Sequence, residues 1–244
     1  MPELKDSGID WIGEIPEDWS ISKLKYVTNI FGRIGFRGYT KEDIVDPFQG
    51  AIALSPSNIS NSQKITLNSS TFISFEKYNE SPEIQVKNGD IILVKTSSIG
   101  KVGILEMENS FEQKITINPQ MIILKNITNI KKFMYYSFIS NYFQFELESN
   151  KSGGVMPTIN ESKINSFSII LPPIEEQKKI ASYLDDKTKK IDLLIENIKK
   201  KIELLEEQRS ALINQVVTKG LDPNVEMKDS GIDWIGEIPE DWSI

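Results

Sequence analysis

The chain has 244 residues, of which 39% are hydrophobic and 26% charged, and its formal net charge is −7. This balance predicts a folded, soluble protein, and the lack of cysteine and histidine excludes disulfides, His-based catalysis and the usual zinc sites. With no run of eighteen apolar residues and no apolar signal segment, the sequence predicts a cytoplasmic protein without a membrane partner.

Few catalytic options are left. Carboxylate-only chemistry is open in principle, but the sequence has no tight acidic cluster typical of a two-metal site. It also has no phosphate loop, no dinucleotide fingerprint and no methyltransferase-like motif. We therefore expect a binding protein with no catalytic residues, no metal ligands and no cofactor of its own. A carboxylate-based nuclease is kept as an unfavoured alternative.

The segment KDSGIDWIGEIPEDWSI occurs twice, at residues 5–21 and again at 228–244. The offset of 223 residues is too long for a solenoid repeat, so it indicates a domain-plus-connector unit. We expect one complete unit of a two-unit protein, followed by the start of the second. The predicted parts are a docking segment (1–21), a recognition domain (22–172), a long helix (173–219), and a linker with the second copy (220–244).

Each copy carries two tryptophans and is interrupted by proline, so it is too apolar for a free tail and unsuited to a helix. Because the copies are identical, we expect equivalent roles in docking against the long helix. The predicted docking residues are Trp11, Trp19, Trp234 and Trp242.

Between residues 22 and 172 the chain alternates short β-like runs with turn residues, then gives way to an aromatic-rich helical stretch. The runs are Lys25–Phe31, Ala51–Leu54, Lys64–Leu67, Ile91–Lys95, Val102–Leu105 and Gln120–Leu124. Asn88-Gly89-Asp90 is predicted to be a tight turn. The helical stretch Lys131–Glu148 is expected to cover the sheet with Phe133, Tyr136, Phe138, Tyr142, Phe143 and Phe145. The fold class is α+β: a mixed α/β domain followed by one long coiled-coil-forming helix.

From Ile174 to Val217 the chain has no glycine or proline, and it begins with acidic residues, as a helix N-terminus prefers. Apolar residues recur every seven positions, while the d positions are mixed and the e positions Ile195, Ile202 and Val216 broaden the stripe. The predicted pairing residues are Leu184, Ile191, Ile198, Leu205 and Leu212. Such a stripe needs a partner helix, from a second unit or a second copy; packing on its own domain is the alternative.

Several segments resemble the specificity subunit of type I DNA restriction–modification enzymes. They are the opening SGIDWIGEIPEDW with SISKLKYV, and the connector from LPPIEEQKKIASYLDD to INQVVTKGL. Two shorter motifs, GRIGFRGY at residues 32–39 and KNGDIILV with SIGK at 87–101, are similar to turns of that family's target recognition domains. The resemblance spans essentially the whole chain, and the connector and repeat are its specific parts.

The resemblance implies a half-length specificity subunit that reads double-stranded DNA and is not itself an enzyme. It implies two methylation subunits as partners, which would hold S-adenosylmethionine, and restriction subunits beyond them. A natural half-length product and a truncated longer protein are both compatible with the sequence. Self-dimerisation through the long helix would rebuild two recognition domains and predicts an inverted-repeat target.

Candidate DNA contacts follow from side-chain chemistry, because arginine and amide side chains read base edges and small donors hold phosphates. The glycine-rich turn offers Arg33, Arg37 and Tyr39, although a structural pairing of an arginine with Asp43 or Asp46 is the alternative. The polar run after a predicted strand can equally be a plain turn. The predicted DNA-binding residues are Arg33, Arg37, Tyr39, Lys95, Thr96, Ser97, Ser98, Lys101, Gln113, Lys114 and Lys151, with Asn118 and Gln120 as further base-reader types.

The charge distribution is compatible with this interpretation. Residues 22–132 carry 14 Lys and Arg against 10 Asp and Glu, whereas the rest of the chain carries 14 against 25. A basic domain with acidic flanks can hold phosphates locally, although ordinary surface variation would give the same count. The rival function is a coiled-coil scaffold or regulatory half-subunit that binds partners without reading DNA.

Overall fold

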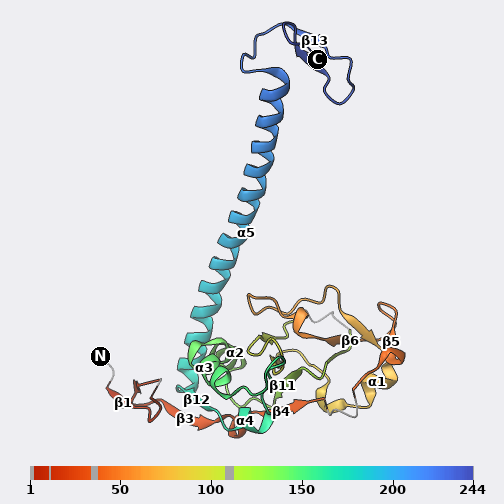
Figure 1. Ribbon diagram of the computed structural model, residues 1–244. Coiled ribbons are helices and arrows are strands. Elements are labelled where there is room, and N and C mark those ends of the chain that lie inside the picture. Colours follow the sequence, from red (N-terminus) through yellow and green to blue (C-terminus); the bar gives the residue numbers. More distant parts are fainter. Residues whose placement is uncertain (1–2, 11, 34–37, 108–112, 244) are drawn as a thin grey trace. The chain divides into compact units, whose positions relative to one another are not determined.

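The computed structural model describes residues 3–10, 12–33, 38–107 and 113–243, and the chain forms two compact units, residues 1–184 and 185–244 (Figure 1). The fold is α+β, as the sequence predicts. The α-helices are α1 (Phe75–Asn79), α2 (Lys131–Ile139), α3 (Asn141–Asn150), α4 (Glu161–Asn165) and α5 (Ile174–Lys219). The strands are β1 (Leu4–Asp6), β2 (Glu14–Pro16), β3 (Ser20–Lys23), β4 (Asn29–Gly32), β5 (Ile44–Val45), β6 (Ala51–Leu54), β7 (Thr71–Ile73), β8 (Ile91–Val94), β9 (Val102–Ile104), β10 (Ile115–Ile117), β11 (Met121–Lys125), β12 (Ser168–Leu171), β13 (Met227–Asp229) and β14 (Glu237–Pro239).

The first unit is built on two four-stranded sheets. The central sheet has the order β4-β11-β8-β9 and is antiparallel throughout. The second sheet has the order β10-β6-β7-β5, with β10 parallel to β6. A separate pair, β3 with β12, joins the start of the domain to the segment just before α5.

The two middle strands of the central sheet, β8 and β11, are covered on both faces, which explains why they are nearly continuous apolar runs. In β8, Ile91 and Leu93 belong to the core shared with α2, α3 and the start of α5. Ile92 and Val94, pointing the other way, belong to the core shared with the second sheet. The first unit is therefore layered as helices, central sheet and second sheet.

The predicted helix Lys131–Glu148 is two helices, because the chain turns at Ser140. Ser140 has extended backbone angles of φ −69° and ψ 151°, and its hydroxyl donates to the carbonyl of Ser137. Phe133, Phe138 and Phe143 are buried in the core as predicted. Phe145 is 52% exposed, so its predicted place over the sheet is wrong.

Two predicted strands also need correction. Residues 24–26 form a short 3-10 helix, so the run Lys25–Phe31 contributes a strand only from Asn29. The run Lys64–Leu67 forms no strand and makes one isolated bridge, between Ile65 and Ile59. Both segments carry apolar residues, as a strand would. Whether they pair as strands depends on residues distant in sequence, and a local sequence pattern does not contain that information.

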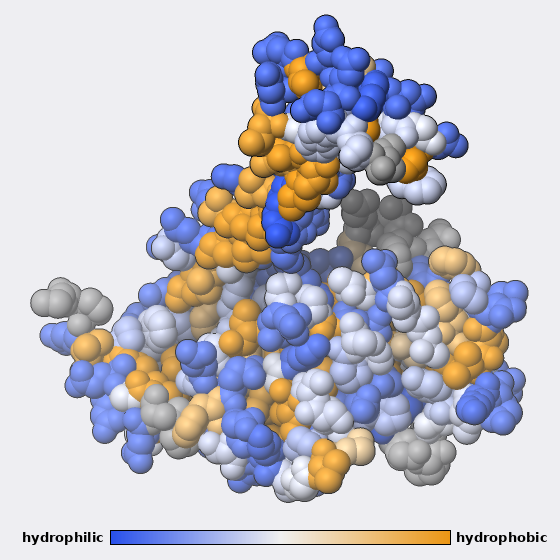
Figure 2. Space-filling view, turned by 45° about the horizontal axis from the view of Figure 1, so that its top comes forward, coloured by the Kyte–Doolittle hydropathy of each residue, from blue (hydrophilic) through white to orange (hydrophobic). Residues whose placement is uncertain are grey.

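The helix α5 has 46 residues, about 69 Å at 1.5 Å per residue. It matches the predicted span closely and ends before Gly220, whose φ is +76°. Its predicted pairing residues Ile191, Ile198, Leu205 and Leu212 are all more than half exposed, and Leu184 is half-buried. Figure 2 shows hydrophobic side chains gathered along the visible face of this helix. In the part of the chain that the structure describes, no helix is long and apolar enough to cross a membrane.

Gly50 provides a test of the packing between β5, β6 and β7. A Cβ at this position would lie 2.0 Å from the carbonyl oxygen of Ile73 and 2.8 Å from a methyl group of Val45. We expect Gly50→Ala to lower the free energy of unfolding by about 1–3 kcal/mol, because the backbone must shift. Gly154→Ala is the control, since a Cβ there meets no atom within 4 Å. Urea denaturation of both variants measures the difference; equal stability would contradict the packing.

Candidate nucleic-acid interface

Three strand ends meet at one end of the central sheet. Gly32, the last residue of β4, pairs with Ile122, and Val94, the last residue of β8, pairs with Met121 at the start of β11. The chain therefore leaves β4 and β8, and enters β11, at the same place. Since both faces of the sheet are covered, polar side chains gather at these strand ends.

Four segments of the chain converge there, which we call the loop cluster: Gly32–Arg33, Lys95–Lys101, Asn118–Gln120 and Lys151–Thr158. The amide of Lys95 donates to the carbonyl of Gln120 (2.8 Å), and the amide of Ser97 donates to the carbonyl of Pro157 (2.9 Å). The hydroxyls of Thr96 and Thr158 are 3.0 Å apart. Segments far apart in sequence are thus tied together by direct hydrogen bonds.

The sequence predicts a flexible basic loop from Lys151 to Thr158, and the structure shows that this loop is closed on itself. Ser152 and Thr158 exchange two backbone hydrogen bonds, of 2.9 and 2.8 Å. The amide of Ile159 then donates to the carbonyl of Lys95 (3.0 Å). The sequence signal for this loop is the Gly153-Gly154 pair followed by Pro157, which is typical of an exposed turn.

Arg33 is buried, with only 4% of its surface exposed. Its Nε donates to the carbonyl of Ile117 (3.1 Å), and its Nη2 donates to the hydroxyl of Thr116 (3.2 Å). Burial lowers the pKa of Arg33, an effect opposed by nearby Tyr39 and by acidic groups that include Asp43. In this structure Arg33 links β4 to β10 and so positions the start of the glycine-rich turn.

Tyr39 is half-buried, and the Arg33 guanidinium lies 5.7 Å from its ring centroid. Burial raises the pKa of Tyr39, and Arg33 partly offsets the rise. The carboxylate of Asp43 accepts from the amide of Thr40 (2.7 Å), capping a short helical turn. The predicted contact Arg37 lies outside the described residues.

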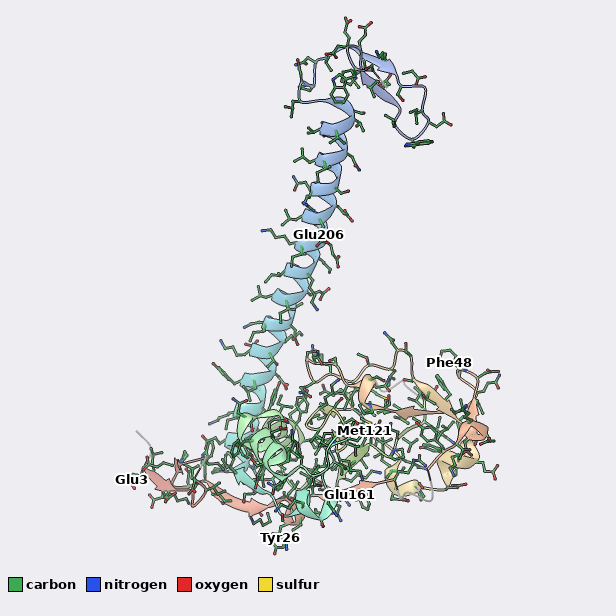
Figure 3. The ribbon with its side chains drawn as sticks, in the orientation of Figure 1. Glu3, Tyr26, Phe48, Met121, Glu161 and Glu206 are labelled. Carbon is green, nitrogen blue, oxygen red and sulfur yellow. The ribbon has the colours of Figure 1, made fainter. Side chains whose placement is uncertain are left out.

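The lysines of the loop cluster have acceptors within the protein. Lys95 forms an ion pair with Glu161 (2.5 Å), Lys151 forms one with Glu148, and Lys101 donates to the carbonyl of Ile59 (3.0 Å). Figure 3 labels two residues of this region, Met121 at the start of β11 and Glu161 in α4. An approaching phosphate would therefore compete with these acceptors for the ammonium groups, while the exposed Ser97 and Ser98 offer hydroxyl donors.

Gln113 and Lys114 lie at the start of β10, whereas the loop cluster lies at its end. The Gln113 side chain donates to the carbonyl of Gly50 (2.7 Å), and the Lys114 ammonium lies 4.9 Å from the ring centroid of Phe75. The structure thus does not bring these two residues together with the others. Asn118 is buried and closes the turn by accepting from the amide of Gln120 (3.1 Å).

A second basic region lies at the opposite end of the central strands. A cavity of about 310 Å³ is lined there by Lys87, Lys125 and Lys131 around the buried Asp90. Burial raises the pKa of Asp90 and lowers that of Lys125. This end contains the confirmed turn Asn88-Gly89-Asp90, where Asp90 N donates to the carbonyl of Lys87 (3.0 Å). In the described ranges, no three acidic side chains form a possible metal site.

The docking segment contacts the first turn of α5. The indole of Trp19 donates to the Glu176 carboxylate (2.9 Å), and the hydroxyl of Ser20 donates to the carbonyl of Leu171 (3.2 Å). Gln177, a residue that the sequence did not single out, is buried beside them. Its amide donates to the carbonyl of Pro172 and to the side chain of Asn129, both at 2.8 Å. Trp11 lies outside the described residues.

Comparison with known proteins decides the family. Residues 16–204 match the family model described as the type I restriction modification DNA specificity domain. The chain belongs to this family.

Relatives of the chain are specificity subunits. The putative type I restriction enzyme MjaX specificity subunit of Methanocaldococcus jannaschii is 30% identical over 96% of this chain and 52% of its own length. The MjaVIII specificity subunit of the same organism is 31% identical over 85% of this chain and 47% of its own length. The chain therefore spans about half the length of these curated relatives.

Solved structures show the same fold at 17% identity. A chain from a type I restriction–modification system, solved in work on complex assembly and conformational transition, matches with a TM-score of 0.66. The match covers 89% of this chain and 49% of that one. The HsdS subunit from Thermoanaerobacter tengcongensis matches with a TM-score of 0.58, covering 89% of this chain and 48% of its own.

Ser97 tests whether the loop cluster holds a strained backbone. Its φ is +65°, which costs about 1–2 kcal/mol for a residue with a Cβ. We expect Ser97→Gly to raise the free energy of unfolding by about 0.5–1 kcal/mol. The relief of backbone strain in the folded state should outweigh the conformational entropy that glycine adds to the unfolded chain. Ser98→Gly is the matched control and should lower it by about 0.5–1 kcal/mol, since its φ is not positive. Thermal and urea unfolding compare the two; a loss in both would contradict the strained loop.

Proposed function

We propose that this chain is a DNA-reading, non-catalytic specificity subunit of a type I restriction–modification enzyme. The observation that carries the proposal is the loop cluster, where four segments present hydroxyl, amide and lysine groups at one end of the central strands. Family membership supports it, because the matching family model is a DNA specificity domain. Phosphate contacts from the lysines and hydroxyls would position the domain, and amide or arginine contacts would read bases.

The partners follow from the same proposal. Two methylation subunits would pack on the scaffold and would carry S-adenosylmethionine, and restriction subunits would complete the nuclease. This chain would supply recognition and spacing. The absence of cysteine and histidine from its sequence limits the chemistry available to its own side chains.

The exposed stripe of α5 supports self-association. The apolar side chains of the stripe lie on one side of the helix, because they are spaced by three, four or seven residues. They belong to residues 191, 195, 198, 202, 205, 212 and 216. Five of them, Ile191, Ile195, Ile198, Ile202 and Leu205, are 46–57% exposed. Antiparallel pairing with α5 of a second copy would bury the stripe and hold two recognition domains at a fixed separation.

The stripe also supports the rival proposal, a scaffold or regulatory half-subunit that binds partners but not DNA. Both functions use α5, and only one uses the loop cluster. DNA binding and its salt dependence therefore separate them, because neutralised phosphates release counterions.

Lys151→Gln tests the loop cluster directly. Lys151 is exposed, and removal of one phosphate contact should weaken DNA binding and reduce the slope of log affinity against log salt by about 0.9. Lys131→Gln is the charge-matched control, because exposed Lys131 lines the cavity at the opposite end. Fluorescence anisotropy across a salt series measures both. Equal effects of the two variants would place the DNA elsewhere, and no salt-dependent binding would favour the scaffold.

Leu205→Lys tests the helix pairing. Each Leu205 buried in a dimer contributes about 1.5–3 kcal/mol, so the charged variant should shift the dimer toward monomer. Leu204→Lys is the control, since Leu204 is 64% exposed but lies off the stripe. Sedimentation velocity of both variants gives the answer. If both dissociate equally, or neither does, the stripe is not the dimer interface.

A further inference from the structure

The two copies of the repeated segment fold identically in different surroundings. The N-terminal copy pairs Lys5 with Ile15, and the C-terminal copy pairs Lys228 with Ile238, in the same antiparallel register. Equivalent side-chain bonds recur: Lys5 Nζ donates to the carbonyl of Glu17 and Lys228 Nζ to that of Glu240, both at 2.5 Å. The fold of the segment is therefore encoded locally.

The N-terminal hairpin contacts the first turn of α5. In the N-terminal copy the indole N–H of Trp19 reaches the Glu176 carboxylate, and Trp19 is half-buried. Trp242 occupies the equivalent position in the C-terminal copy and is 36% exposed. Its ring lies near Gly220, 3.5 Å from where a Cβ of that residue would be. Within the described residues, the Trp242 indole N–H has no hydrogen-bond acceptor.

We propose that the C-terminal copy of one chain docks on the α5 first turn of a second copy of this chain, with Trp242 donating to Glu176 there in place of Trp19. The occupant is specified by sequence: residues 228–243 repeat residues 5–20 letter for letter, so any surface that binds one hairpin is chemically matched to the other. The receptor is the first turn of α5 with the adjoining strand β12.

Geometry delivers the segment to that receptor. The inference rests on the proposed antiparallel pairing of α5. In such a pair the helix end at Lys219 lies at the same end of the pair as the partner's helix start at Ile174. The C-terminal copy begins only nine residues after α5 ends, so it would be held close to the partner's Glu176 at high effective concentration.

The consequence is competition between two identical hairpins for one site. Trp19 directly precedes β3, which is paired with β12, so the N-terminal copy is held at the receptor by a short tether. The C-terminal copy displaces it only when a second chain is paired. Docking in trans thus links dimerisation to release of the N-terminal hairpin, and it adds a second contact at each end of the helix pair.

Cross-linking can test this in the 244-residue chain, which has no native cysteine. Asp18 and Asp241 are equivalent exposed positions in the two copies, and Glu175 is exposed on the first turn of α5. With a short bismaleimide, D18C/E175C should cross-link within a chain and D241C/E175C between chains. Adding Trp19→Phe, which keeps the ring and removes the donor, should raise the interchain product about tenfold. Adding Trp242→Phe should lower it about tenfold.

Sedimentation of the same variants separates this inference from the proposed helix pairing. A dimer that persists in Trp242→Phe, with loss of the interchain product, supports both. A dimer whose interchain product is indifferent to both Phe variants overturns the docking and leaves the helix pairing intact. A monomer with no interchain product overturns both. Circular dichroism confirms that each variant keeps its helix, and E176A should lower both the intrachain and interchain products.

Discussion

The structure depends on a central sheet that is buried on both faces. Because α2, α3 and α5 cover one face and the second sheet covers the other, β8 and β11 carry apolar residues at every position but the last of β11. Polar chemistry is therefore confined to the strand ends. One end holds the loop cluster and the other holds the lysine-lined cavity, so the same packing fixes the positions of both polar regions. Binding residues at the ends of a rigid sheet are held more precisely than residues on free loops.

The sequence predicted the elements with strong periodicity. The span of α5, the strands at Ala51–Leu54 and Ile91–Val94, and the turn at Asn88–Asp90 were all recovered, because each is encoded by neighbouring residues. The break at Ser140 and the exposure of Phe145 were not, since both depend on how α3 packs after the turn. Family membership came from the repeat and connector, which are long and specific signals.

The candidate site was only partly accessible to sequence reasoning. The run Lys95–Lys101 and Lys151 were singled out separately, but nothing in the sequence indicated that Ser97 and Pro157 share a hydrogen bond. Residue type alone does not report a side chain's partners: arginine is a common base reader, and Arg33 is buried and bonded to Ile117 and Thr116. A side chain's partners depend on long-range pairing, which composition does not report.

We propose that two identical recognition domains, joined through α5, read DNA with their loop clusters. Selection of bound duplexes from a random double-stranded library, at physiological salt and with sequencing of the enriched pool, tests this most directly. The enriched duplexes should contain an inverted repeat whose half-sites flank a gap of fixed length and free sequence. Enrichment of a non-palindromic site would contradict the paired domains, and a pool without enrichment would contradict DNA reading by this chain.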